Sequence, residues 1–433
     1  MYGIASHDGI PGEQPPAPAG DHVRVLRCLN GTPAQSIEKI LAMAGGVEGI
    51  VGIEDVVVIK PNAQWWNHGA PNLAALIALV GCIMERPGGF RGEVVLAENC
   101  HRGPRPWEAL SSAWARAFER NHELSQAGNL GEAAALLKRR FGDRFTLRHW
   151  VDVKAGGRRV RGPEEGYGYV YCDGTGGVPL LRCDNGIEGP GRRETIMTYP
   201  VFTTDRGTRI DIKNGIWDKG TYPGRPLKFI NLSALNHHST YCGMTAAIKN
   251  YLGVADLSGG ADPHAGGRLT DRYCNFHSFP FDKWAPGPAP GMLGKEIAVF
   301  LRTVRRADLN IVTAEWIGLS SRTDPPVART RAILASTDPV ALDFHAAKYL
   351  LYPNSGIRLH DPENERGPLN QYLRACSKEG GGIFDEAAVS VVTYDFSAAR
   401  TEIGRGRPVS GEILWGVGTP AWLRYLALRH FVR

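Results

Sequence analysis

The residues best suited to chemistry are concentrated between positions 233 and 253. This segment contains two adjacent histidines followed by three further polar side chains, namely His237, His238, Thr245, Lys249 and Asn250. It leaves a strand-like apolar run, 227–232, and we expect a helix to begin near Gly243. The first N–H groups of a helix have no partner within it and attract anions, and an imidazole can move protons near neutral pH. The segment therefore predicts an anion site with acid/base capacity.

The spacing of these residues indicates which of them can act together. On a helix that begins near Gly243, Thr245 and Lys249 are four residues apart and share a face, whereas Asn250 lies about 100° further round. If the histidine segment is extended, His237 and His238 point to opposite sides, so only one faces the site. A single histidine is more often a core or capping residue. We predict His238, or failing that His237, as the general acid/base.

A second polar group follows two expected strands. Asp55–Lys60 and Glu93–Glu98 are apolar runs of strand length, and the first continues into Pro61 and Asn62. The carboxyl ends of parallel strands meet at one edge of a sheet, where ligands bind. Lys60, Asn62 and Glu98 therefore form a second set of binding candidates. The alternative is that Pro61 merely ends the strand while Lys60 faces water.

A third segment combines a helix start with an unusual carboxylate. Asp338 followed by Pro339 is typical of an N-cap with proline in the first helical position, which accounts for Asp338 structurally. Asp343 falls within an otherwise apolar helix, 340–351. A carboxylate on an apolar face is costly unless it is paired, so we expect Asp343 to meet a lysine or an amide.

The metal and cysteine patterns are less specific. A divalent metal stays open, because nitrogen and oxygen ligands are available from His237, His238, Asp262, His264, Asp271 and His277. No His-x-His or His-Glu-x-x-His spacing accompanies them. The eight cysteines include no Cys-x-x-Cys pair, which argues against an iron–sulfur cluster and favours reduced thiols.

Composition excludes several classes of protein. The 433 residues are 43% hydrophobic and 22% charged, with a net charge of +6 spread along the chain. No basic run typical of nucleic-acid binding is present, and the longest apolar run, 73–84, is too short to span a bilayer. The N-terminus lacks the pattern of a secretory signal. We expect a cytoplasmic protein, leave a homo-oligomer open, and expect no nucleic-acid partner.

The element pattern predicts an α/β fold with a mainly parallel open sheet flanked by helices. Helices are expected at 38–44, 72–85, 108–140 and 340–351, and strands at 55–60, 93–98, 227–232, 309–313, 331–336 and 388–394. Glycine-rich residues 150–226 contain short β-prone runs, 167–172 and 195–201, and predict an antiparallel β insertion. The expected organisation is a tail, 1–20, two α/β halves, 21–145 and 227–400, around an insertion or cap, 146–226, and an extension, 401–433. That extension ends in a basic amphipathic helix carrying Trp422, Leu423, Leu426 and Phe431, which we expect to pack on the core.

Three of these segments together resemble the family known as domain of unknown function 362. The family pattern has a hydrophobic strand ending in Lys-Pro-Asn, a Gly-Val-Thr-x-x-x-Lys-Asn-x-x-Gly run, and Asp-Pro-Val-Ala-x-Asp. The corresponding segments are 56–62, 243–253 and 338–343, in the same order. Asn236 stands where the family's Lys-x-His segment has lysine, and Thr313 where Ile-Val-Asp has aspartate. The ferredoxin-like cysteine cluster of many members has no counterpart, so its electron-transfer role does not carry over.

A fainter similarity concerns the nickel-pincer lactate racemase group. The order His238 to Lys249 is similar to its His followed by Gly-x-Ser-Gly-Gly-Arg-Lys, but Ala246-Ala247-Ile248 replaces Gly-Gly-Arg. This similarity implies proton or hydride transfer at a carbon bearing oxygen.

We therefore predict an enzyme that acts on an anionic small molecule by acid/base chemistry, of isomerase, lyase or oxidoreductase type, with a metal or cofactor left open. Lys60 and Lys249 bind the anion, and Asn62 and Thr245 orient it. Lys249 is also a catalytic candidate, and Asn250 and Glu98 complete the binding set. Two alternatives remain, a non-catalytic ligand-binding or cofactor-binding protein and a metal-dependent redox protein with a separate iron–sulfur partner.

Overall fold

The computed structural model describes residues 23–99, 112–150, 159–186, 188–189, 192, 194–256, 261–262, 268–269 and 290–431. The expected tail, 1–20, and the metal candidates His264, Asp271 and His277 lie outside these residues. The side chain of Asp262 lies outside them as well.

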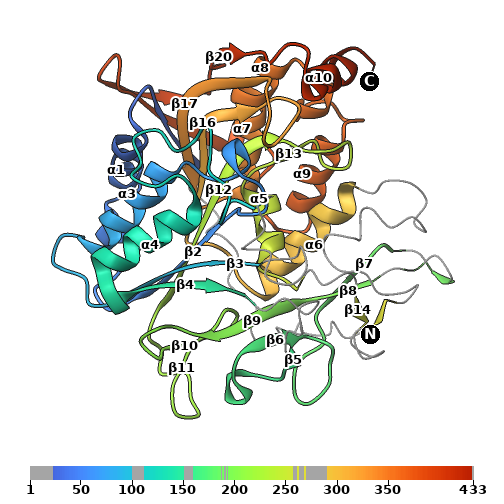
Figure 1. The fold of residues 1–433 in the computed structure, drawn as a ribbon. Coiled ribbons are helices and arrows are strands. Elements are labelled where there is room, and N and C mark those ends of the chain that lie inside the picture. The colour runs from blue at the N-terminus through green and yellow to red at the C-terminus, as the bar shows by residue number, and fades with distance from the viewer. Residues whose placement is uncertain are drawn as a thin grey trace, which may run out of the picture.

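A large sheet of eleven described strands organises the chain (Figure 1). Its order is β19-β18-β1-β17-β16-β12-β2-β3-β4, with β13 paired to β12 and β20 paired to β17. The strands are β1 (Val23–Leu29), β2 (Val56–Pro61), β3 (Glu93–Glu98), β4 (Phe145–His149), β12 (Leu227–His237), β13 (Met244–Thr245), β16 (Leu309–Gly318), β17 (Val327–Ser336), β18 (Val389–Asp395), β19 (Arg400–Gly404) and β20 (Glu412–Leu414).

The strands β16, β12, β2, β3 and β4 form a continuous parallel block. On its other side, β17 runs antiparallel to both β16 and β1, while β1 and β18 are parallel. The α/β fold with a large, mostly parallel sheet is therefore confirmed. Because parallel strands point the same way, β2, β3 and β12 all deliver their carboxyl ends to one edge.

Helices cover both faces of the sheet (Figure 1). Successive side chains of a strand point to opposite faces, and Val56 and Val58 accordingly belong to one core cluster while Val57 and Ile59 belong to the other. The second cluster packs against α1 (Pro33–Met43), α3 (Leu73–Met84) and α4 (Leu130–Phe141). The first packs against α5 (Ala247–Asn250), α6 (Pro290–Thr303), α7 (Pro339–Ala346) and α9 (Pro368–Lys378).

The expected glycine-rich β insertion forms a separate sheet below β3 and β4 in Figure 1. Its order is β11-β10-β9-β6-β5, from β5 (Arg159–Val160), β6 (Gly168–Tyr171), β9 (Thr198–Thr203), β10 (Arg209–Asp211) and β11 (Gly215–Trp217). All pairings are antiparallel except that of β5 with β6. A two-stranded ribbon of β7 (Arg182–Asp184) and β8 (Glu194–Ile196) accompanies it.

Several expected elements have different bounds. The predicted helix 108–140 is wrong over 112–129, which is irregular, because Asn129 caps α4 by accepting a hydrogen bond from the N–H of Glu132. The predicted helix 340–351 is α7 followed by a π-helical turn, Ala347–Leu351, and by α8 (Tyr352–Ser355). The strands expected at 309–313 and 331–336 extend to ten residues each.

The last helix, α10 (Pro420–Phe431), packs on the core as expected, through Leu426 from the predicted set and also through Tyr425 and Leu428. Tyr425 and Leu428 are buried, whereas Leu423 and Phe431 are mostly exposed. No helix in the described part of the chain is both long enough and apolar enough to cross a bilayer.

Candidate functional site

The segment from Asn236 to Asn250 begins as strand rather than helix. Strand β12 runs on through His237, and after a tight turn β13 pairs back on it, with Thr245 opposite Asn236. The turn needs Gly243, whose φ is +75° and whose added Cβ would overlap the carbonyl oxygen of Leu359. The helix α5 begins only at Ala247. The expectation that Thr245 and Lys249 share a helix face is therefore wrong.

The helix N-terminus that suggested an anion site is filled by a carboxylate of the chain. Asp343 Oδ1 accepts a hydrogen bond from the N–H of Ala247 at 2.8 Å, and Oδ2 accepts one from the N–H of Ile248 at 2.9 Å. The prediction that Asp343 meets a lysine or an amide is confirmed, since its partners are backbone amides. Complete burial raises the pKa of Asp343 to about 7, against the opposing effect of the two N–H groups. Asp343 thus ties α7 to α5.

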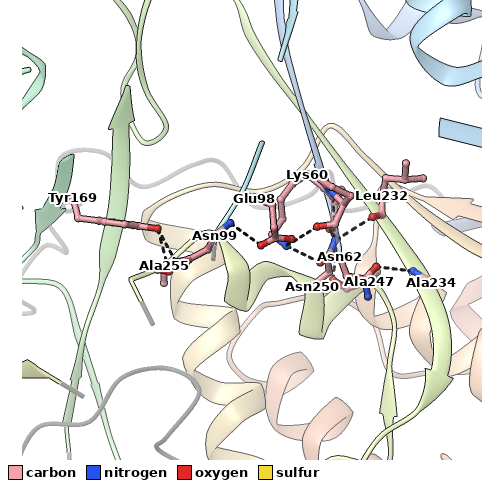
Figure 2. Close-up of polar contacts among 12 residues, drawn as sticks. Lys60, Asn62, Glu98, Asn99, Tyr169, Leu232, Ala234, Ala247, Asn250 and Ala255 are labelled. Atoms are coloured by element: carbon pink, nitrogen blue, oxygen red, sulfur yellow. Dashed lines mark hydrogen bonds and ion pairs between the residues drawn. The ribbon is translucent and has the colours of Figure 1, made fainter. Parts of the chain in front are cut away.

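Lys60 and Glu98 form a buried ion pair at the carboxyl ends of β2 and β3 (Figure 2). Lys60 Nζ lies 2.6 Å from Glu98 Oε2 and donates to Asn250 Oδ1 at 2.7 Å. Lys60 is 1% exposed, so the alternative in which it faces water is wrong. Burial raises the pKa of Glu98, and the Lys60 ammonium opposes that rise. The predicted strand ends are brought together, and Asn250 joins them.

The glycine at position 253 allows the backbone to pass close to the Lys60–Glu98 ion pair. An added Cβ at Gly253 would overlap both Glu98 Oε1 and Lys60 Nζ. Only a residue without a side chain allows the turn after α5 to pass so near the ion pair.

Asn250 links the ion pair to a row of amides in the sheet. Its Nδ2 donates to Lys60 O at 3.1 Å and to Asn231 Oδ1 at 2.7 Å. Asn231 in turn donates to Asn310 Oδ1 at 2.9 Å, and the hydroxyl of Tyr251 donates to the same oxygen at 2.8 Å. The sequence analysis missed Asn231, Asn310 and Tyr251. Their signal was an asparagine inside an apolar strand, which burial requires to be hydrogen-bonded.

Two further polar residues hold neighbouring segments in place. Asn62 Oδ1 accepts from the N–H of Ala234 at 2.9 Å, which ties the segment after β2 to β12. Asn99 donates to the hydroxyl of Tyr169 at 2.7 Å and to Ala255 O at 2.6 Å. Figure 2 shows that this contact connects the β insertion to the ion pair.

Lys249 is a buried cation without a partner in the described part of the chain. It is 8% exposed, and its ammonium has no hydrogen-bond or ion-pair partner among the described residues. The pKa of Lys249 is lowered to about 8, mainly by burial; the charges of Arg322 and Lys60 act in the same direction, and Cys242 opposes them. A buried amine is costly unless an opposite charge compensates it. The uncompensated charge makes Lys249 a candidate position for binding an anion.

The two adjacent histidines have different environments. His237 Nδ1 lies 2.9 Å from His360 Nε2, and His360 Nδ1 lies 2.8 Å from Ser355 Oγ. His237 Nε2 is buried without a hydrogen-bond partner among the described residues. His238 Nδ1 instead accepts from the N–H of Ser239 at 2.7 Å. The sequence analysis missed His360 and Ser355, because nothing in the sequence relates them to His237, which lies 123 positions before His360.

Arg322 adds positive charge to this region. It lies in the connection between β16 and β17, with its guanidinium 5.1 Å from the centroid of the Trp65 ring. Burial lowers the pKa of His237 well below its usual range, and His360, Arg424 and Arg322 act in the same direction. Because Arg322 also acts on Lys249, the imidazole and the amine lie within its electrostatic range. The sequence analysis missed Arg322 as well.

No group of three or more His, Cys, Asp or Glu side chains suited to a metal is present in the described ranges. His237 pairs with a second histidine, and the described contacts add no third ligand. The divalent metal that the sequence left open therefore has no ligand set among the described residues.

Comparison with known proteins gives one match. Residues 206–348 match the model of a family described as "Domain of unknown function (DUF362)". This range includes His237, Lys249 and Asp343 but not Lys60 or His360. No match was found among the curated proteins or the solved structures. The resemblance to the DUF362 family is thus confirmed over residues 206–348.

Proposed function

We propose that the protein is an enzyme that binds an anionic small molecule at Lys249 and transforms it by acid/base chemistry. The observation that carries this proposal is the buried Lys249 ammonium, which has no partner among the described residues. A pKa of about 8 leaves the amine mostly protonated at pH 7 and free of its proton at slightly higher pH. The same group can therefore attract an anion and exchange a proton with it.

The neighbouring residues supply the rest of the site. His237 offers an unpartnered Nε2, and Arg322 adds a second positive charge. Of the two histidines, we place His237 at the ligand, because His238 Nδ1 is used within its own turn. Thr245 remains a candidate for orienting the ligand from β13.

Lys60, Glu98 and Asn250 would then act on the ligand indirectly. Lys60 contacts both Glu98 and Asn250, and other polar atoms of the three bond to the backbone and to Asn231. Asn250 directly follows Lys249 in α5. We assign them the role of fixing α5, and with it Lys249, against the carboxyl ends of β2 and β12.

A binding measurement with a matched variant tests the proposal. Thermal shifts of the wild type with inorganic phosphate and a panel of small carboxylates are compared with those of Lys249→Met and Lys378→Met. Lys378 is an exposed lysine in the last turn of α9. We expect at least one anion to stabilise the wild type and Lys378→Met but not Lys249→Met. Equal stabilisation of all three would contradict the proposal.

Turnover is tested separately from binding. The wild type and Lys249→Met are incubated with a cell metabolite extract, and consumed and formed compounds are followed by mass spectrometry. Loss of a compound with the wild type alone supports an enzyme. Binding of an anion that is recovered unchanged would indicate a ligand-binding protein instead.

A further inference from the structure

A chain of hydrogen bonds runs from the backbone to His237. The N–H of Ile357 donates to Ser355 Oγ at 3.2 Å, Ser355 Oγ lies 2.8 Å from His360 Nδ1, and His360 Nε2 lies 2.9 Å from His237 Nδ1. His237, His360 and Ser355 are all buried. Each contact between two neutral groups uses one hydrogen, so the direction of one bond determines the direction of the next.

The Ser355 hydroxyl sets that direction. Its oxygen accepts from Ile357, and its single hydrogen has two acceptors within reach, His360 Nδ1 at 2.8 Å and Tyr352 O at 3.5 Å. Tyr352 O already accepts the N–H of Gly356 at 2.9 Å. The shorter contact and the unused imidazole lone pair favour donation to His360 Nδ1.

The positions of the imidazole hydrogens in His360 and His237 follow from this donation by Ser355. With Nδ1 accepting, neutral His360 carries its hydrogen on Nε2 and donates it to His237 Nδ1. Neutral His237 must then carry its own hydrogen on Nε2, the atom without a partner among the described residues.

We infer that Ser355 and His360 are positioning residues that hold His237 as a hydrogen-bond donor through Nε2, so that the ligand presents an oxygen acceptor there. This inference rests on the proposed function for the presence of a ligand. It narrows the ligand to an anion whose carboxylate, phosphate or carbonyl oxygen receives the Nε2–H. The positive charges of Lys249 and Arg322 favour the same kind of group.

The direct test reads the tautomer in the ligand-free protein. Protein containing ¹⁵N-labelled histidine is examined by imidazole NMR, with His237 and His360 assigned through single substitutions. We expect both rings to be neutral, with Nε2 protonated and Nδ1 giving the downfield resonance of a bare nitrogen. His68 is an internal reference, because its Nε2 lies 3.2 Å from the carbonyl oxygen of Ser321, which can only accept. A hydrogen on Nδ1 of His237 would overturn the inference.

Two variants separate positioning from simple structural support. Ser355→Ala removes the hydroxyl hydrogen, and we expect the Nδ1 and Nε2 resonances of His237 to move toward each other as both tautomers become populated. Ser355→Thr keeps the hydroxyl and should retain the wild-type pattern. An unchanged His237 tautomer in folded Ser355→Ala would exclude Ser355 as its determinant. If a variant does not fold, the wild-type spectrum still decides the tautomer.

The outcome is independent of the proposed function. The expected tautomer together with equal anion binding by wild type and Lys249→Met would refute the proposed function alone. The opposite tautomer together with Lys249-dependent binding would refute this inference alone.

Discussion

Lys60 Nζ lies 2.6 Å from Glu98 Oε2, and both side chains are almost completely shielded from solvent. Two charges removed from water persist only because each compensates the other and because Asn250 and the backbone use their remaining hydrogen-bonding capacity. The pair joins two strand ends that are 38 residues apart. It therefore makes the edge of the sheet a rigid base for the helix that carries Lys249.

Replacing one member of the Lys60–Glu98 pair should destabilise the folded protein strongly. Lys60→Met leaves Glu98 buried without its cation, and we expect a loss of about 3–5 kcal/mol in the free energy of unfolding. Urea denaturation measures the change. The double variant Lys60→Met/Glu98→Gln should recover part of it. Arg91→Met breaks the exposed pair with Glu54 and should cost less than about 1 kcal/mol. Similar losses for both single variants would show that burial of the pair has no special weight.

Replacing Lys249 should stabilise the fold while it removes the proposed anion binding. The folded pKa of about 8 is below the ordinary value of 10.5, so the unfolded chain binds the proton more tightly, and stability rises as the pH increases from about 8 to 10.5. At neutral pH the buried amine costs up to about 3 kcal/mol, which Lys249→Met should regain in part. Thermal unfolding between pH 7 and 10.5 tests this. The gain should shrink toward pH 10.5, and a Lys249→Met variant less stable than wild type at pH 7 would contradict it.

Position 253, next to the Lys60–Glu98 ion pair, should not tolerate a methyl side chain. Gly253→Ala places Cβ against Glu98 and Lys60, and we expect at least about 2 kcal/mol of destabilisation. Gly81→Ala is the matched control, because no atom lies within 4 Å of its added Cβ in α3. This control should be neutral or up to about 1 kcal/mol stabilising, as expected for alanine in a helix. Denaturant unfolding of the two variants decides the point.

Both carboxylate oxygens of Asp343 should be required, so that an asparagine of the same size cannot replace it. Asp343→Asn replaces one acceptor oxygen with an NH₂ group that faces a backbone N–H, so one of the two hydrogen bonds to α5 is lost. We expect a loss of about 1–3 kcal/mol in the free energy of unfolding. Anion binding at Lys249 should weaken in parallel, as measured by thermal shift. Wild-type stability and binding in Asp343→Asn would show that α5 is held by other contacts.

The elements around the site differ in how far they could be predicted. A strand buried on both faces is a continuous β-branched run, and the strands expected at 55–60 and 93–98 therefore agree closely with β2 and β3. The helix expected near Gly243 failed, because a positive φ and the nearby carbonyl of Leu359 turn the chain into a hairpin first. The spacing of residues along a helix predicts neither the positive φ of Gly243 nor the nearby carbonyl of Leu359.

The hydrogen-bond partners of the site residues could be predicted from the sequence even less well. Asp343 could be predicted to need a partner, since burial demands one, but not which N–H groups would supply it. His360 and Ser355 have no local pattern, because only tertiary packing brings them to His237. Pairings across more than a hundred residues are determined by the fold as a whole.

The position of α10 near the end of the sequence affects the order in which parts of the structure can form during synthesis. The hydroxyl of Tyr425 in α10 donates to the carbonyl oxygen of Ser355 at 3.1 Å, and the hydroxyl of Ser355 in turn contacts His360. During synthesis, residues 233–360 leave the ribosome well before Tyr425. The nascent chain can thus pair the strands from β1 to β17 early, yet the contact of α10 with Ser355 forms only when α10 has emerged. Translation must reach the final turns before the histidine pair acquires its finished geometry.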